Sequence, residues 1–288
     1  MNNLFAGSAF KLLNLTIFTF TSLLFVKFKS GLSPLQQLFM IAIFGAISFV
    51  PWIIATGGRH LKTSNFKIYI LRTLLSVSGM LTWVKAIMLL GANEATLIAY
   101  LTPLLTLFIA ALLKQEKLRA ECLLGVLSCI VVIVMFLGLK GRPVSTEGVV
   151  LALISANIWA LFDLVCKWQG QTVHYLTQSF YNFVCSSVLM APFAYKALFM
   201  LTRADVYMLG SVGFLRAINV ICLFMAYRLA PLNFLMPLSY TRIIIVAVGS
   251  FLMLDIYPTL DLLFCAGLII LINVFVFARR ARIVLQPR

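Results

Sequence analysis

The chain is divided almost completely into apolar runs about as long as the hydrocarbon core of a membrane is thick. A helix that crosses this core takes about 20 apolar residues. Ten such runs cover residues 5–26, 34–56, 66–90, 92–113, 119–139, 147–168, 176–200, 204–227, 233–254 and 258–278. The connectors between them are short and leave no room for a separate soluble domain. We therefore predict an all-α polytopic membrane protein with ten transmembrane helices.

The charged residues support this reading and indicate an orientation. Only 11% of the residues are charged, whereas soluble domains have about a quarter. The net charge of +15 is scattered over loop ends and forms no basic domain, so nucleic acid is excluded as a partner. If both termini are cytoplasmic, the inner loops and the tail hold about twice as many Lys and Arg residues as the outer loops, as the positive-inside rule requires.

The sequence offers no chemistry typical of an enzyme. All six cysteines lie inside expected spans without a CxxC or metal-ligand spacing, which is typical of buried apolar thiols. The two histidines, His60 and His174, lie in expected cytoplasmic loops. There is no zinc-protease, paired-carboxylate or ATP-binding motif. We expect no catalytic residue, no metal and no cofactor.

The two halves of the chain match each other at an offset of about 140 residues. Asn93 and Tyr100 match Asn233 and Tyr240, and further landmarks recur in the same order. The polar connector at residues 140–148 separates the halves, which gives a first repeat at 1–140 and a second repeat at 147–288 that ends in a basic cytoplasmic tail. Because each half has five helices, the second half enters the membrane from the opposite side. Such inverted repeats are typical of secondary transporters, with the site near the midplane.

The segments Arg72–Gly138 and Arg216–Phe277 resemble the paired repeats of the drug/metabolite transporter superfamily, in its EamA-like ten-helix branch. The features shared are an Arg near the start of the third helix, a fourth helix of the type ATLIAYLTPLLTLFIAALL, and an acidic residue at its end, Glu116 or Asp255. Leu61–Trp83 is also similar to S-adenosylmethionine uptake carriers of obligate intracellular bacteria, as are the segments Ala160–Lys167 and Pro237–Ile244. The resemblance implies a carrier of the bacterial inner membrane, with the first, third, fourth, sixth, eighth and ninth helices around its cavity.

Charged side chains inside the spans are the first candidates for a substrate site, because burying them in a membrane is costly. Arg216 and Arg242 lie near the middle of their spans, and each is either a ligand for the substrate or a structural group. Asp163 is the only acidic residue well inside a span, and it would bind a cationic centre, carry a proton or pair with a cation. Since positive charges outnumber negative ones in the spans, we expect a carboxylate or a zwitterion rather than a cationic drug.

Aromatic and amide side chains complete the expected substrate site. Tyr100, Tyr240 and Trp83 would stack on a planar or cationic ligand, and Asn14 and Asn219 share helix faces with the cationic residues. The remaining two candidates, Pro103 and Pro237, would act as hinges in the fourth and ninth helices. Proline in a membrane helix is also often merely tolerated.

The leading hypothesis is a secondary transporter that moves a small polar or zwitterionic metabolite by alternating access, with S-adenosylmethionine uptake as the first substrate. The alternatives are an exporter of amino acids, related metabolites or drugs and, in another class, a channel or membrane scaffold. A channel is disfavoured because the sequence has no filter-like loop or ring of like charges. The expected partners are a small-molecule substrate and the lipid bilayer. The sequence leaves the direction of transport, the coupling ion and the choice between monomer and homodimer open.

Overall fold

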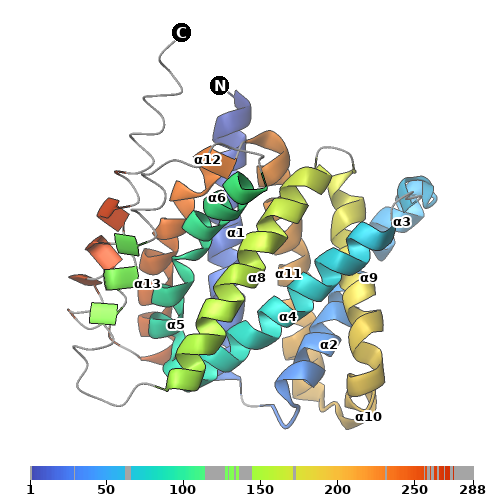
Figure 1. The fold of residues 1–288 in the computed structure, drawn as a ribbon. Helices are drawn as coiled ribbons and strands as arrows, with labels where there is room; N and C mark the ends of the chain where they lie inside the picture. Colours follow the sequence, from blue (N-terminus) through green and yellow to red (C-terminus); the bar gives the residue numbers. More distant parts are fainter. Residues whose placement is uncertain are drawn as a thin grey trace. The chain divides into compact units, whose positions relative to one another are not determined.

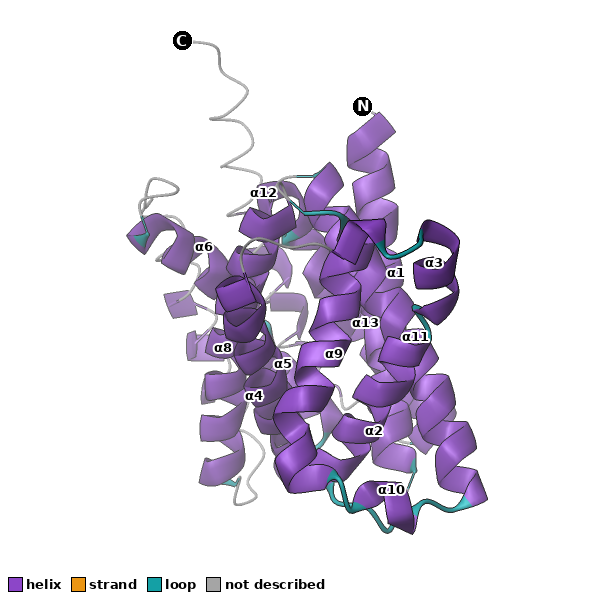
Figure 2. Cartoon of the chain, turned by 90° about the vertical axis from the view of Figure 1, so that its right-hand side faces the viewer, coloured by secondary structure: helices purple, strands orange, loops and turns teal. Residues whose placement is uncertain are grey.

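The computed structural model describes residues 2–28, 30–61, 66–113, 145–170, 173–230 and 232–255, together with part of the residues between 127 and 135 and between 257 and 275. All regular structure in this part of the chain is helical (Figures 1 and 2). The helices are α1 (Asn2–Lys27), α2 (Pro34–Ile47), α3 (Val50–Thr56), η1 (Arg59–Leu61), α4 (Phe66–Leu90), α5 (Ala92–Ala99), α6 (Thr102–Leu112), α8 (Thr146–Gly170), α9 (Tyr175–Ala194), α10 (Ala197–Met200), α11 (Arg203–Leu229), α12 (Leu232–Leu235), η2 (Pro237–Thr241) and α13 (Arg242–Leu254). The all-helical fold class is thus confirmed.

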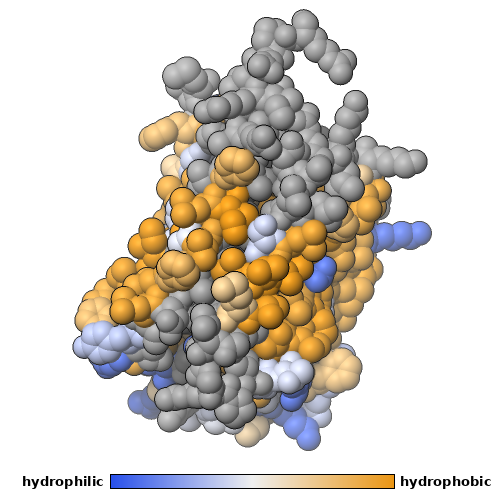
Figure 3. All heavy atoms as spheres, turned by 60° about the vertical axis from the view of Figure 1, so that its left-hand side comes forward, coloured by the Kyte–Doolittle hydropathy of each residue, from blue (hydrophilic) through white to orange (hydrophobic). Residues whose placement is uncertain are grey.

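Six segments within the described ranges are long and apolar enough to cross a membrane. They are Asn3–Phe25, Pro34–Thr56, Phe66–Leu90, Glu94–Leu112, Thr146–Gln169 and Arg203–Leu229. Large apolar side chains remain exposed on these helices, and the described residues on the face drawn in Figure 3 are mainly hydrophobic. Of the other expected spans, 176–200 and 233–254 are not among these six, and 119–139 and 258–278 lie largely outside the described residues. The count of ten therefore stays a prediction.

The chain folds into two compact units, and each unit takes segments from both halves of the sequence. The first unit comprises Met1–Leu81 and Val165–Ala230, and the second comprises Thr82–Leu164 and Pro231–Arg288. The helices α4 and α8 each run from one unit into the other. The first helices of the chain are therefore packed against helices that come more than 100 residues later.

The first unit is a bundle in which α1 lies along α11, while α2 packs against both α9 and α11. Small residues allow the closest of these approaches. A Cβ atom added to Gly213 on α11 would lie 2.7 Å from the Phe44 Cβ atom and 3.0 Å from the Gly45 backbone nitrogen on α2. Close backbone contact of this kind is how membrane helices gain packing energy without a hydrophobic effect between them.

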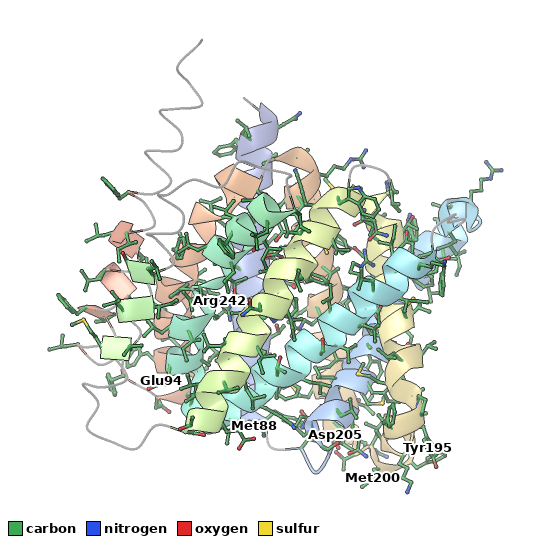
Figure 4. The ribbon with its side chains drawn as sticks, in the orientation of Figure 1. Met88, Glu94, Tyr195, Met200, Asp205 and Arg242 are labelled. Atoms are coloured by element: carbon green, nitrogen blue, oxygen red, sulfur yellow. The ribbon has the colours of Figure 1, made fainter. Side chains whose placement is uncertain are left out.

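Side-chain caps fix the start of α11 and join it to the loop that follows α1. The Thr202 hydroxyl accepts from the Asp205 amide at 3.1 Å, and the Asp205 carboxylate accepts from the Thr202 amide at 3.0 Å, which is a capping box. Ser30 Oγ donates to Asp205 Oδ1 at 2.7 Å. Figure 4 labels Asp205, Tyr195 and Met200 at this end of the first unit.

The second unit contains two helices that are interrupted at matching places. The expected fourth span is divided into α5 and α6, with a break at Tyr100 and Leu101. The expected ninth span is divided into α12, the 3₁₀ turn η2 and α13, and Tyr240 lies in that turn. Both spans were expected as single helices kinked by proline. The structure instead separates helical segments, and two of them, α6 and η2, begin with a proline in their first turn.

One glycine contact occurs once in each unit, at the same offset as the sequence repeat. In the first unit, a Cβ atom on Gly7 of α1 would lie 2.9 Å from the Ala230 Cβ atom, just after α11. In the second unit, a Cβ atom on Gly148 of α8 would lie 2.8 Å from the Leu90 Cγ atom, at the end of α4. Each half therefore presents a glycine near the start of its first helix to the end of the third helix of the other half.

Candidate functional site

A guanidinium group surrounded by aromatic rings forms the centre of the candidate site in the second unit. Arg242 is the first residue of α13, directly after η2 (Figure 4). Its Cζ atom lies 4.8 Å from the centroid of the Trp83 ring on α4. A cation this close to an indole face is attracted by the ring quadrupole. The interaction helps to hold the guanidinium against the Trp83 ring.

Two tyrosines lie beside this pair, and each occupies one of the helix breaks. The rings of Tyr100 and Tyr240 have centroids 5.6 Å apart with an interplanar angle of 50°. Both side chains are 2% exposed. The Arg242 guanidinium is close enough to interact electrostatically with the Tyr100 hydroxyl group. The structure thus brings together four expected site residues, Trp83, Tyr100, Tyr240 and Arg242, from three separate segments of the chain.

The buried polar atoms of this cluster include the Trp83 Nε1 atom and the Tyr100 hydroxyl oxygen, and neither has a hydrogen-bond partner among the described residues. Leaving a buried donor unsatisfied costs about 1–3 kcal/mol, which is why such atoms in native proteins call for an explanation. A ligand with hydrogen-bond acceptors would satisfy both atoms. The cluster therefore combines a cation, hydrogen-bond donors and aromatic ring faces. These groups suit a ligand that has both a polar group and a planar ring.

The other expected site residues of the first unit lie on α1 and α11. Asn14 Nδ2 donates to the Asn219 carbonyl at 3.1 Å, and Asn219 Nδ2 donates to the Asn14 carbonyl at 2.6 Å. Both side chains are buried. This reciprocal pair connects the two helices through their backbones, so the amides serve to align α1 with α11.

Arg216 lies one turn before Asn219, and two of its contacts are with neutral groups. Its Cζ atom lies 4.8 Å from the centroid of the Phe18 ring, and its Nη2 atom donates to the Met80 sulfur at 3.0 Å. Neither contact neutralises the charge. Phe18 shares a helix face with Asn14, but no sequence pattern indicated that Met80, 136 residues away from Arg216, would lie beside this guanidinium.

A further buried cation, Arg72, is tied into the first unit by two glutamines that sequence reasoning did not single out as partners. Arg72 is 0% exposed. Its guanidinium donates to Gln169 Oε1 at 2.7 Å and to the Gln178 carbonyl, and it lies over the rings of Tyr69 and Phe224. Amide oxygens and aromatic faces thus replace the hydration shell of this charge. Arg72 connects α4 to the end of α8 and the start of α9.

Comparison with known sequences decides the family. The sequence profile of the EamA-like transporter family matches residues 6–138 and again residues 146–278. The chain belongs to the EamA-like transporter family. This family is part of the drug/metabolite transporter superfamily, so the resemblance drawn from the sequence is confirmed. The protein is therefore a membrane-embedded transporter of a small molecule and not an enzyme.

Several EamA-like relatives have names that state a substrate. The S-adenosylmethionine uptake transporter of Rickettsia prowazekii is 22% identical over 94% of this chain and 92% of its own length. The transporter of the same name from Rickettsia bellii is 24% identical over 85% of this chain and 84% of its own. The riboflavin transporter of Brucella anthropi is 21% identical over 49% of each chain. A solved crystal structure shares the fold, with a TM-score of 0.71, 17% identity and coverage of 97% of this chain and 99% of that chain.

The remaining candidates of this EamA-like chain take separate positions. Asp163 is half-buried on α8, in the part of that helix that belongs to the second unit. Pro103 and Pro237 lie in the first turns of α6 and η2, immediately beyond the helix breaks or within them. The side chains of Asn93 and Asn233 lie outside the described part of the chain. Roles in binding or hinging for these residues stay predictions.

Proposed function

We propose that this transporter takes up S-adenosylmethionine across the bacterial inner membrane as a secondary carrier, working by alternating access with both termini in the cytoplasm. Two relatives that carry this substrate in their names match most of the chain. The chain has no ATP-binding motif of its own. Transport is therefore driven by an existing transmembrane gradient or by exchange of one solute for another.

The observation that carries the substrate assignment is the cluster of Arg242, Trp83, Tyr100 and Tyr240. S-adenosylmethionine combines a carboxylate, an ammonium group, a sulfonium group and a planar adenine ring. The Arg242 guanidinium provides a charge-assisted partner for the carboxylate. The aromatic rings provide faces for the adenine and for the sulfonium, and the Trp83 and Tyr100 donors provide hydrogen bonds to the carboxylate or the ring nitrogens.

The other expected binding residues have distinct tasks in this proposal. Asp163 would receive the ammonium or the sulfonium group. Arg216, in the first unit, stays a candidate contact for an anionic group, and its neutral neighbours there are Phe18 and Met80. Asn14 and Asn219 act as positioning residues, because their amides already join α1 to α11.

The interrupted helices support an alternating-access mechanism. Transporters with inverted repeats commonly bind substrates at discontinuous helices near the membrane midplane. Here the breaks at residues 100–101 and 237–241 carry Tyr100 and Tyr240. We propose that Pro103 and Pro237 let the flanking segments reorient around the bound substrate. The paired contacts of Gly7 and Gly148 support two halves, 1–140 and 147–288, that are related as inverted repeats.

The test is uptake of labelled S-adenosylmethionine into proteoliposomes together with equilibrium binding to the purified protein. We expect saturable binding in the native protein and a loss of about tenfold or more in affinity for Tyr100→Phe and for Trp83→Phe, since each removes a donor to the ligand. Tyr195→Phe serves as the matched control, because Tyr195 is half-exposed and lies directly after the C-terminal end of α9.

A panel of competitors separates the candidate substrates. Methionine, adenosine, neutral amino acids and riboflavin are added in excess to the uptake assay. If amino acids are transported while S-adenosylmethionine neither moves nor competes, the substrate assignment is wrong and an amino-acid carrier replaces it. If riboflavin competes better than the other compounds, the substrate assignment is likewise wrong, and a flavin becomes the proposed substrate.

A further inference from the structure

The helix α8 presents an amide group on a face that is otherwise built for lipid. Val150, Leu153, Ile154 and Leu161 are between 37% and 48% exposed. They recur every three or four residues and therefore share one side of the helix. Asn157, in the middle of this stripe and near the centre of α8, is also exposed.

This exposed stripe faces away from the packed side of α8. Ala152, Ser155, Ala156 and Ala160 are all at most 1% exposed and lie on the packed side. Valine, leucine and isoleucine are poorly suited to line a path for a polar metabolite, whereas the hydrocarbon of a bilayer covers such side chains readily. The stripe is therefore suited to contact with the membrane interior.

The helix α1 offers a comparison, because it has the same pattern one repeat earlier. Leu12, Leu13 and Phe20 are exposed there, and Thr16 occupies the position that corresponds to Asn157. The Thr16 hydroxyl donates to the Leu12 carbonyl at 3.0 Å, within its own helix. A hydroxyl has only one hydrogen to donate, so this local bond leaves Thr16 compatible with lipid.

The Asn157 amide has more capacity than its own helix uses. Its Nδ2 atom donates to the Leu153 carbonyl at 2.9 Å, which is the one hydrogen bond this amide makes within the described residues. A second N–H and a carbonyl oxygen with two lone pairs remain. Hydrocarbon satisfies neither of them, and amides in membrane helices are known to bond across helix–helix contacts.

We propose that the α8 stripe of Val150, Ile154, Asn157 and Leu161 is an interface with a second copy of this chain. An amide is both donor and acceptor, so two Asn157 side chains related by a two-fold axis satisfy each other. Such self-complementarity is what a symmetric dimer requires, because the same patch is used by both copies. Two copies inserted in the same direction would place α8 beside α8, with each residue of the stripe near its own counterpart. This inference is independent of the substrate.

The first experiment measures dimerisation in proteoliposomes by energy transfer between two populations labelled at the N-terminus, over a range of protein-to-lipid ratios. We expect Asn157→Leu to raise the dimer dissociation constant by about threefold to tenfold, with thermal stability and substrate binding unchanged. The matched control is Thr16→Val, at the corresponding position of α1, which should leave the dimer unaffected. An equal effect of both variants, or energy transfer that depends on neither, would overturn the proposal.

The second experiment locates the contact by cysteine cross-linking in a background without native cysteines. Single cysteines at Val150, Ile154 or Leu161 should form disulfides between identical positions of two copies, whereas a cysteine at Leu13 of α1 should not. Cross-linking at Leu13 with none on α8, or a monomer at every protein-to-lipid ratio, contradicts the inference. Cross-linking of the α8 cysteines to a different membrane protein would also contradict the inference.

Discussion

At the scale of single residues, three arginines inside the expected spans have neutral groups among their contacts. Arg72 is bonded to amide oxygens, Arg216 lies against a thioether and a phenyl ring, and Arg242 lies over an indole. Such partners orient a guanidinium without cancelling its charge. We therefore separate Arg72, whose guanidinium is hydrogen-bonded to Gln169 and Gln178, from Arg242, whose guanidinium lies over the Trp83 ring of the candidate site.

Replacing Arg72 should destabilise the fold. Arg72→Met removes the buried hydrogen bonds to the Gln169 side chain and the Gln178 carbonyl, which should cost about 1–3 kcal/mol of unfolding free energy. Arg72→Lys should recover only part of this, because an ammonium group lacks the planar fork. Unfolding in detergent measures the effect. Lys67→Met, at an exposed position on the same helix, is the control, and equal stability of the two Met variants would contradict the assignment.

Replacing Arg242 should remove discrimination in favour of a carboxylate. We expect the native protein to bind S-adenosylmethionine about tenfold to a hundredfold more tightly than its decarboxylated analogue, as a charge-assisted hydrogen bond implies. In Arg242→Gln the two affinities should become similar. Calorimetry with both ligands on both proteins gives the ratio. If the ratio of the two affinities is unchanged in Arg242→Gln, the carboxylate is bound by another cation. Arg216→Gln would then be the next variant to measure.

At the scale of the elements, glycines on α11 decide how closely that helix meets its neighbour. Gly213 leaves no space for a methyl group, since its Cβ would meet backbone and Cβ atoms of α2 at 2.7–3.0 Å. Gly210, one turn earlier on α11, has nothing nearer than the Phe44 ring at 3.9 Å. The two positions share a helix and a neighbour and differ in the distance between the packed surfaces.

Alanine at these two positions should have opposite consequences. Gly213→Ala forces α2 and α11 apart and should cost about 1–3 kcal/mol, as overpacking usually does. Gly210→Ala places its methyl group in ordinary contact and should be neutral or slightly stabilising, because alanine favours helix over glycine. Thermal unfolding of the two variants in the same detergent makes the comparison. A Gly213→Ala protein as stable as Gly210→Ala would show that the helices relax at little cost.

At the scale of the whole molecule, the family assignment makes the chain a membrane transporter, and the loops carry a prediction of its orientation. Ser145, before α8, lies in an expected outer loop, and Arg59, in η1, lies in an expected inner loop. The excess of Lys and Arg in the expected inner loops favours this orientation.

Cysteine labelling in intact bacterial cells tests the orientation. In a background without native cysteines, Ser145→Cys should react with a membrane-impermeant maleimide from outside, and Arg59→Cys should react only after the membrane is permeabilised. The reverse labelling pattern would mean that the protein is inserted in the opposite orientation, with both termini outside. Labelling of both residues from the same side would contradict the odd number of helices between them.

The sequence by itself determined the class of the protein. Apolar runs of span length and scarce charge can be satisfied only by helices in a bilayer, since every backbone group must find its partner locally. The recurrence of residues such as Tyr100 and Tyr240 likewise pointed to the family, because a repeat is visible without a structure. The apolar runs and the repeat are both properties of the order of residues, so they can be detected without a structure.

Only the tertiary structure decided which side chains act together. Sequence reasoning chose Trp83, Tyr100, Tyr240 and Arg242 separately, and the structure makes them one cluster at two helix breaks that had been expected as kinks. It also gave Arg72 a partner 97 residues away and Arg216 a partner 136 residues away. No local pattern encodes such pairs, because the partner of a buried charge is set by how the helices pack and not by the period of the chain.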